Sequence, residues 1–117
     1  MSADDVACKV EAEIDGNWDV SNHHGVDLRK CLVRPPRLLT YKNSWYHHAG
    51  RTDPDVRLLS TPTLQLWLVL HERPQSRDGY AIVYDEVADQ FGLASDEASD
   101  NVFLGHYGNF LETLEAM

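Results

Sequence analysis

The chain has 117 residues, is 43% hydrophobic and 25% charged, and carries a formal net charge of −9. This length suits one domain, and the ordinary globular composition excludes a disordered or low-complexity chain. The excess of acidic residues argues against a protein whose main task is to bind nucleic-acid phosphates, because that affinity depends on lysine and arginine. The negative charge suits solubility or a basic partner instead.

The N-terminal residues predict an amphipathic helix over about residues 3–15. Ser2 and Asp5 have the spacing of a capping box, in which side chains satisfy the free N–H groups at a helix start. The apolar residues that follow recur every four positions, as one helical face requires: Val6, Val10 and Ile14. Gly16 is expected to end this helix.

A second, shorter helix is expected next, capped by Asp27 and running through Val33. Pro35 and Pro36 must end it, since proline lacks the N–H that a helix interior needs. The run RLLTYK, residues 37–42, then predicts a first strand.

Three more strands are expected over residues 64–72, 80–86 and 91–95. In the first of them, one face carries alternate leucines: Leu64, Leu66, Leu68 and Leu70. Its other face is also largely apolar, so this strand should be covered on both sides. Asp78-Gly79 is a hairpin signal, and the links between these strands are too short for a helical crossover, which indicates an antiparallel meander.

The C-terminal residues predict a last helix, begun by Asn109 with Glu112 three positions later. One face of this helix is apolar: Phe110, Leu111, Leu114 and Met117. Gly105 and Gly108 are expected to serve turns before it. The whole pattern predicts a single α+β domain over residues 1–117, an antiparallel β-meander of about four strands with an N-terminal helix, a short second helix and a C-terminal helix.

The segment 43–63 is longer than most loops in compact domains, and such loops are usually functional or disordered. It contains Trp45 and Tyr46 side by side. These aromatic residues either fold back to cover the core or form a hot spot that binds a partner. Both interpretations stay open at this stage.

No catalytic residue, metal site or cofactor is predicted. The chain lacks GxSxG and HExxH motifs, and its adjacent histidine pairs would point in opposite directions on an extended chain. Cys8 and Cys31 are expected to be small buried residues and not a disulfide. The N-terminus has no secretory-signal pattern and no apolar run reaches the roughly 20 residues that span a bilayer, so a cytoplasmic protein is expected.

Charge is strongly polarised along the chain. Residues 1–27 hold seven acidic residues and one lysine, residues 28–77 hold nine basic and three acidic residues, and residues 78–117 hold nine acidic residues with no lysine or arginine. Six of these acids crowd the turns on either side of FGLAS and are candidate partner-binding residues: Asp85, Glu86, Asp89, Asp96, Glu97 and Asp100. If these carboxylates share a common rim, a basic partner would relieve the repulsion between them. The basic middle segment could instead line an RNA groove, but we favour its pairing with the acidic ends.

The second half of the chain, residues 64–117, contains the runs LWLVLHERP, GYAIVYDE, FGLAS and VFLGHYGNFLETLEAM. These runs resemble a group of small bacterial proteins, the immunity partners of polymorphic toxins and of contact-dependent growth inhibition systems. The resemblance rests on core and turn residues and transfers no binding residue to this sequence. It implies a non-enzymatic cytoplasmic protein that binds and neutralises a toxin in the producing cell.

The resulting prediction is an immunity protein for a basic, nuclease-type toxin domain, with no direct contact to nucleic acid or membrane. Such an inhibitor would need tight binding, on the order of nM or about −12 kcal/mol. Charge alone would not supply that affinity, so Trp45 and Tyr46 join the acids as candidate partner-binding residues. The alternative is a small cytosolic regulatory or scaffold module that binds proteins and has no toxin partner.

Overall fold

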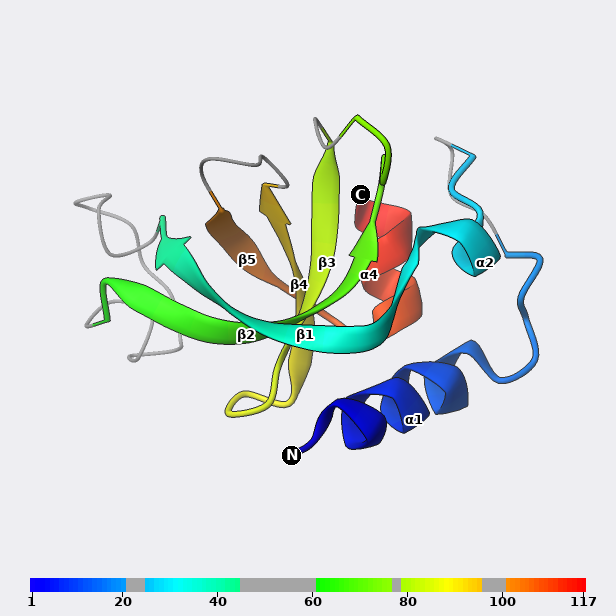
Figure 1. Ribbon diagram of the computed structural model, residues 1–117, viewed down its shortest axis with the longest axis horizontal. Helices are drawn as coiled ribbons and strands as arrows, with labels where there is room; N and C mark the ends of the chain where they lie inside the picture. The colour runs from blue at the N-terminus through cyan, green and yellow to red at the C-terminus, as the bar shows by residue number, and fades with distance from the viewer. Residues whose placement is uncertain (21–24, 45–60, 77–78, 96–100) are drawn as a thin grey trace.

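The strands follow one another around a small barrel, as Figure 1 shows in the computed structural model, which describes residues 1–20, 25–44, 61–76, 79–95 and 101–117. The elements in chain order are α1 (Ala3–Ile14), α2 (Leu28–Cys31), β1 (Leu32–Asn43), β2 (Thr63–His71), β3 (Tyr80–Asp85), β4 (Gln90–Ser95), β5 (Val102–Gly108) and α4 (Phe110–Ala116). Successive strands pair antiparallel, and β1 and β5 meet in parallel at two residue pairs, which closes the barrel. The predicted single α+β domain is confirmed.

Two apolar clusters lie on opposite faces of this sheet. The inner cluster fills the barrel with side chains from all five strands: Leu39, Tyr41, Leu64, Leu66, Val83, Ala94 and Phe103. The outer cluster joins the other face of β2, β3 and β4 to the apolar faces of α1 and α4. Because β2, β3 and β4 contribute to both clusters, they read as nearly continuous apolar runs and not as alternating ones.

Helix α1 forms as the sequence predicts. Ser2 Oγ accepts a hydrogen bond from the Asp5 N–H, and the Asp5 carboxylate accepts one from the Ser2 N–H, so the capping box is complete. The predicted apolar face is fully buried: Val6, Val10 and Ile14. The C-cap is Asp15, which adopts a left-handed conformation (φ 50°) one residue before the expected Gly16.

The second helix is shorter, and the first strand longer, than predicted. Asp27 caps α2 as expected, its Oδ1 accepting from the Arg29 N–H at 3.0 Å. The helix stops at Cys31, however, and β1 begins at once with Leu32. The strand takes in both prolines, because the register of β1 on β2 is broken between Leu32 and Arg37 and no ladder hydrogen bond is needed there.

In β2 the predicted alternation of leucines fails at one position. The register with β3 shifts between Leu68 and Leu70, so one residue is added on β2. This bulge turns Leu70 to the outer cluster, where it joins Trp67 and Val69 instead of Leu64 and Leu66. Burial on both faces, as predicted for this strand, is confirmed from Leu66 to His71.

One strand, β5, was not predicted, and it includes the two glycines that were assigned to turns, Gly105 and Gly108. Its register on β4 shifts twice, between Phe91 and Gly92 and between Leu93 and Ala94. Each shift breaks the two-residue alternation by which a strand is recognised. Gly92 is packed so closely against Gly105 and Phe103 of β5 that a side chain there would collide with them.

Helix α4 follows β5 directly and closes the outer cluster. Asn109 Oδ1 accepts from the Glu112 N–H at 2.8 Å, as the capping pattern predicts. Phe110 and Leu114 are buried against the sheet, with Leu111 partly buried beside them. Phe110 makes an edge-on ring contact with Phe91 of β4 at 5.6 Å between centroids.

Two further expectations have mixed outcomes. Cys31 is buried, but Cys8 lies exposed on the outer side of α1, contrary to prediction, and both thiols are free. Segment 45–60, with Trp45 and Tyr46, lies outside the described residues. Within the described part of the chain, no helix has the length and apolar character needed to cross a membrane.

Candidate functional site

The four-residue turn between β3 and β4, residues 86–89, is built on the buried carboxylate of Asp85. Asp85 Oδ1 accepts hydrogen bonds from the N–H groups of Val87 (3.2 Å) and Ala88 (3.4 Å). These bonds satisfy two backbone donors that the turn would otherwise leave unpaired. The turn is therefore held from inside by a side chain of the preceding strand.

The other carboxylate oxygen of Asp85 reaches β5. Its Oδ2 lies 2.9 Å from His106 Nε2, and the exposed fractions of the two side chains are 2% and 10%. Both groups are satisfied when His106 carries a hydrogen on Nε2 and donates it to the Asp85 carboxylate. The His106 ring also meets Phe103 of the barrel interior edge-on at 5.0 Å, so this polar pair lies against the inner cluster.

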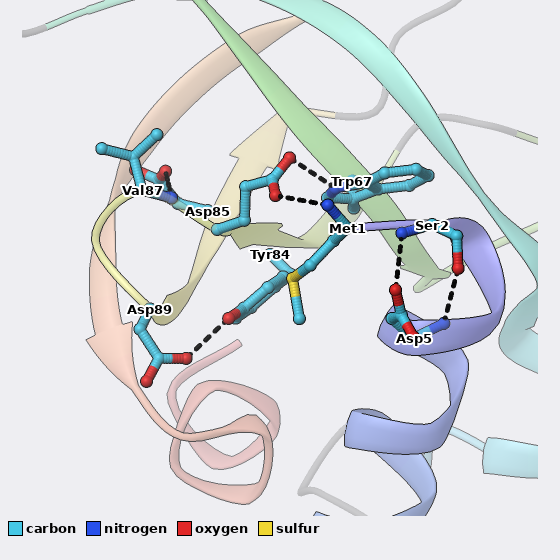
Figure 2. A network of polar contacts seen from close by, with 9 residues as sticks. Met1, Ser2, Asp5, Trp67, Tyr84, Asp85, Val87 and Asp89 are labelled. Atoms are coloured by element: carbon cyan, nitrogen blue, oxygen red, sulfur yellow. Dashed lines mark hydrogen bonds and ion pairs between the residues drawn. The ribbon is translucent and has the colours of Figure 1, made fainter.

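Asp89 ends the turn in a left-handed conformation (φ 52°) and is tied to β3 and α1. The Tyr84 hydroxyl donates to Asp89 Oδ1 at 2.6 Å (Figure 2). Lys9 Nζ lies 3.2 Å from the same oxygen. The hydrogen bond from Tyr84, followed by that from Lys9, holds the pKa of Asp89 below its usual range. Burial of Tyr84, and then its bond to Asp89, raises the pKa of this hydroxyl well above its usual value.

Lys9 forms ion pairs with two carboxylates, those of Asp89 and Glu13. Partial burial by itself would lower the pKa of this lysine, but the bonds and charges of Asp89 and Glu13 outweigh it, and the net pKa is raised. Lys9 Nζ also lies over the Tyr84 ring, 5.5 Å from its centroid. The lysine therefore stays charged and links α1 to the β3–β4 turn.

Glu86 joins the turn to the N-terminus and to the outer cluster. Its Oε1 accepts from Trp67 Nε1 at 3.3 Å, and its Oε2 pairs with the Met1 ammonium at 3.2 Å (Figure 2). About a third of the Glu86 side chain stays exposed, so the pair is weak in energy. It orients the carboxylate rather than burying it.

The structure distinguishes among the acids that the sequence singled out. Asp85 is 1% exposed and lies inside the domain, so its predicted place on an exposed rim is wrong. The burial of Asp85 could not be predicted from its neighbours in the sequence, because the residue that pairs with its carboxylate, His106, lies 21 residues away. Glu86 and Asp89 are exposed at the turn as expected. The other candidates lie outside the described residues: Trp45, Tyr46, Asp96, Glu97 and Asp100.

Two exposed apolar side chains beside this turn were not predicted. Val87, at the middle of the turn, is 75% exposed, and Tyr107 of β5 is 44% exposed. Figure 2 shows Val87 at the outer end of the polar network, pointing away from Tyr84 and Trp67. One sequence feature could have indicated the exposure of Val87: it is a single valine within the acidic run DEVAD, and it fits neither a strand nor a helix period.

The acidic segments at the two ends of the sequence lie next to each other in the fold. Figure 1 shows α1 and the β3–β4 turn on the same side of the barrel. Glu13 Oε1 of α1 accepts from the Phe110 N–H at the start of α4 at 2.7 Å, which joins the two helices. We call α1, the turn and α4 together the acidic side; its exposed carboxylates are Asp4, Asp5, Glu11, Asp15, Glu86, Asp89, Glu112 and Glu115.

An open groove of about 720 Å³ lies elsewhere, between α2 and the residues that follow β2. Lys30, Arg73 and Cys31 contribute to its lining. Burial raises the pKa of the Cys31 thiol, which disfavours the thiolate that nucleophilic chemistry requires. Among the described residues, no three histidine, cysteine or acidic side chains are grouped as a metal site would need.

Comparison with known proteins identifies no relative. No protein family matches the chain, and neither a curated protein nor a solved structure matches it. The candidate site therefore rests on the geometry of the β3–β4 turn and on the charge of the elements around it.

Proposed function

We propose that this chain is an immunity protein, which binds a basic toxin domain and neutralises it in the cell that makes both. The binding would be non-catalytic and would involve neither a cofactor nor direct contact with nucleic acid or membrane. The resemblance of residues 64–117 to such proteins suggests the class. The observation that carries the proposal is the acidic side.

The acidic side supports a basic partner because the fold concentrates charge instead of neutralising it. Two acidic stretches of sequence, separated by the basic middle segment, come together at α1, the turn and α4. Lys9 is the one lysine or arginine that these three elements contain, and Asp89 and Glu13 already pair with it. Like charges held this close repel one another, and a cationic surface would remove that repulsion.

Several cations among the described residues belong to other elements than these carboxylates. Arg37 and Lys42 are exposed on β1, and Arg29 pairs with Asp19 in the segment after α1. Arg29 and Arg34 also lie over the Trp18 ring, 5.9 and 5.1 Å from its centroid. Internal pairing of the basic segment with the acidic ends, as the sequence suggested, holds for Arg29, while the acidic side keeps its excess charge.

A toxin that attacks RNA or DNA needs a cationic surface to hold its substrate. An acidic protein would be steered to that surface and would compete with nucleic acid for it. This accounts for a domain with a strongly negative side. The same charge would make association fast at low salt and slower as salt screens it.

The proposal predicts that the neighbouring gene encodes a toxin, and the test is co-expression of the chain with that toxin domain. Protection of growth and co-purification of the two proteins would support the proposal, and loss of both would overturn it in favour of a module without a toxin partner. The double substitution Glu11→Lys with Glu115→Lys should slow association about tenfold at low salt, since both side chains are exposed on the acidic side. Arg37→Glu, which adds an acid on β1 instead, is the control and should not slow it.

A further inference from the structure

We propose that Val87 and Tyr107, which we call the turn patch, form the apolar centre of the partner interface. The partner surface that fits it is a basic protein surface with an apolar pocket in its middle. This inference rests on the proposed function and names the part of the acidic side that would supply affinity.

The turn patch combines high exposure with a position that the domain does not require. Val87 is exposed over 75% of its surface and Tyr107 over 44%, although both side chains gain free energy when buried. Val87 stands between two exposed acids, Glu86 and Asp89, at the middle of a turn where a polar residue would serve the fold equally well. Exposed aromatic and aliphatic groups within a polar rim are typical of interface centres.

Val87 belongs to the β3–β4 turn and Tyr107 to β5, and a buried contact between their near neighbours joins the two segments. Asp85, two residues before Val87, bonds to His106, the residue before Tyr107. Phe91 and Gly92 of β4 pair with Gly108 and His106 of β5, so Tyr107 is the extra residue of a β-bulge. A bulge of this kind redirects one side chain out of the sheet pattern, and here it leaves Tyr107 exposed.

The turn is also fixed before any partner arrives. Asp85 holds the N–H groups of Val87 and Ala88, and Tyr84 and Lys9 hold Asp89 at its end. A loop that needs no ordering loses less entropy on binding, so more of the contact energy remains as affinity. Tyrosine adds a large contact area with few rotatable bonds.

The charge around the patch specifies the chemistry of the partner. Glu86 and Asp89 flank Val87, and the acidic side extends from them along α1. Lysine and arginine on the partner would meet this rim and set the rate of association. The apolar pocket would take Val87 and Tyr107 and set the rate of dissociation, as in interfaces with a dry centre and a charged edge.

The experiment measures binding of single variants to the toxin domain encoded by the neighbouring gene. Val87→Ser and Tyr107→Ala should each raise Kd at least tenfold, chiefly through faster dissociation. The matched controls are Leu38→Ser on β1, 45% exposed, and Tyr80→Ala at the opposite end of β3, 46% exposed. Neither control should change Kd by more than about twofold, and unchanged melting temperatures would show that all four variants fold.

The possible outcomes separate the two proposals. If the unsubstituted protein binds and the patch variants bind as well as the controls do, the turn patch is not the centre and the proposed function stands. If patch and control variants weaken binding equally, the centre lies elsewhere and the inference is again wrong. If the unsubstituted protein does not bind, the proposed function fails and the inference fails with it.

Discussion

Asp85 of β3 and His106 of β5 are joined across β4 by a 2.9 Å contact between Oδ2 and Nε2, both almost fully buried. The same carboxylate accepts from two N–H groups of the β3–β4 turn. One buried side chain therefore fixes the turn, links it to a strand that is not its sequence neighbour, and lies against the barrel core. The exposed residues of the turn therefore depend for their position on the buried contact between Asp85 and His106.

Asp85→Ala is expected to destabilise the domain by about 3 kcal/mol, because it leaves His106 and two turn N–H groups without their acceptor. Asp85→Asn should cost less, since its carbonyl oxygen can still accept. Urea denaturation measures both changes. Glu86→Ala is the matched control, and its exposed ion pair should cost less than about 1 kcal/mol. Equal losses for Asp85→Ala and Glu86→Ala would contradict the structural role of Asp85.

Glu13 ties α1 to α4, and its removal should loosen the two helices together. Its carboxylate accepts from the Phe110 N–H at 2.7 Å, a charged hydrogen bond for which about 1.5–3 kcal/mol is typical. Glu13→Ala should lower the free energy of unfolding by about that amount, and Glu13→Gln by less. Hydrogen exchange should show faster exchange at the Phe110 amide in the alanine variant. Glu11→Ala, exposed on the same helix, should leave that amide protected.

The acid dependence of stability should involve Asp89. Its folded pKa lies below the ordinary value, so the stability it contributes is present above about pH 4 and is lost as pH falls through the folded pKa. Tyr84→Phe removes the hydrogen bond that contributes most to this shift, so the pKa of Asp89 should rise toward its ordinary value. Carboxyl-carbon NMR titration measures the change. Tyr107→Phe, at an exposed tyrosine, should leave the Asp89 titration as it was.

Gly92→Ala should prevent the domain from folding or destabilise it by more than about 3 kcal/mol. An added Cβ would collide with the Gly105 carbonyl and the Phe103 ring, and backbone in a paired strand cannot move aside cheaply. Gly79→Ala is the control, because the nearest atoms that the added methyl meets there belong to the side chain of Glu72, whose carboxylate end can shift, and not to backbone. Circular dichroism and thermal melting of both variants decide the point, and a folded Gly92→Ala protein with an unchanged melting temperature would disprove this close packing.

Local sequence signals were sufficient for α1, α4 and three strands. The capping residues Ser2 and Asn109 and the four-residue spacing in α1 act within a few residues of chain, so their effect is visible in the sequence. The apolar runs of β2, β3 and β4 were long enough to be recognised as strands. The prediction for β5 failed because its pairing depends on two bulges, and a bulge becomes visible only against the partner strand.

The sequence by itself determined the α+β class, the caps of α1 and α4, and the polarised distribution of charge, since each follows from neighbouring residues or from simple counting. Only the tertiary structure decided where those charges act. Closing the barrel brought α1 beside the β3–β4 turn, buried Asp85 against His106, and left Val87 and Tyr107 exposed near them. Residues 21 to 85 positions apart make these contacts, and long-range packing of that kind leaves no periodic trace in the sequence.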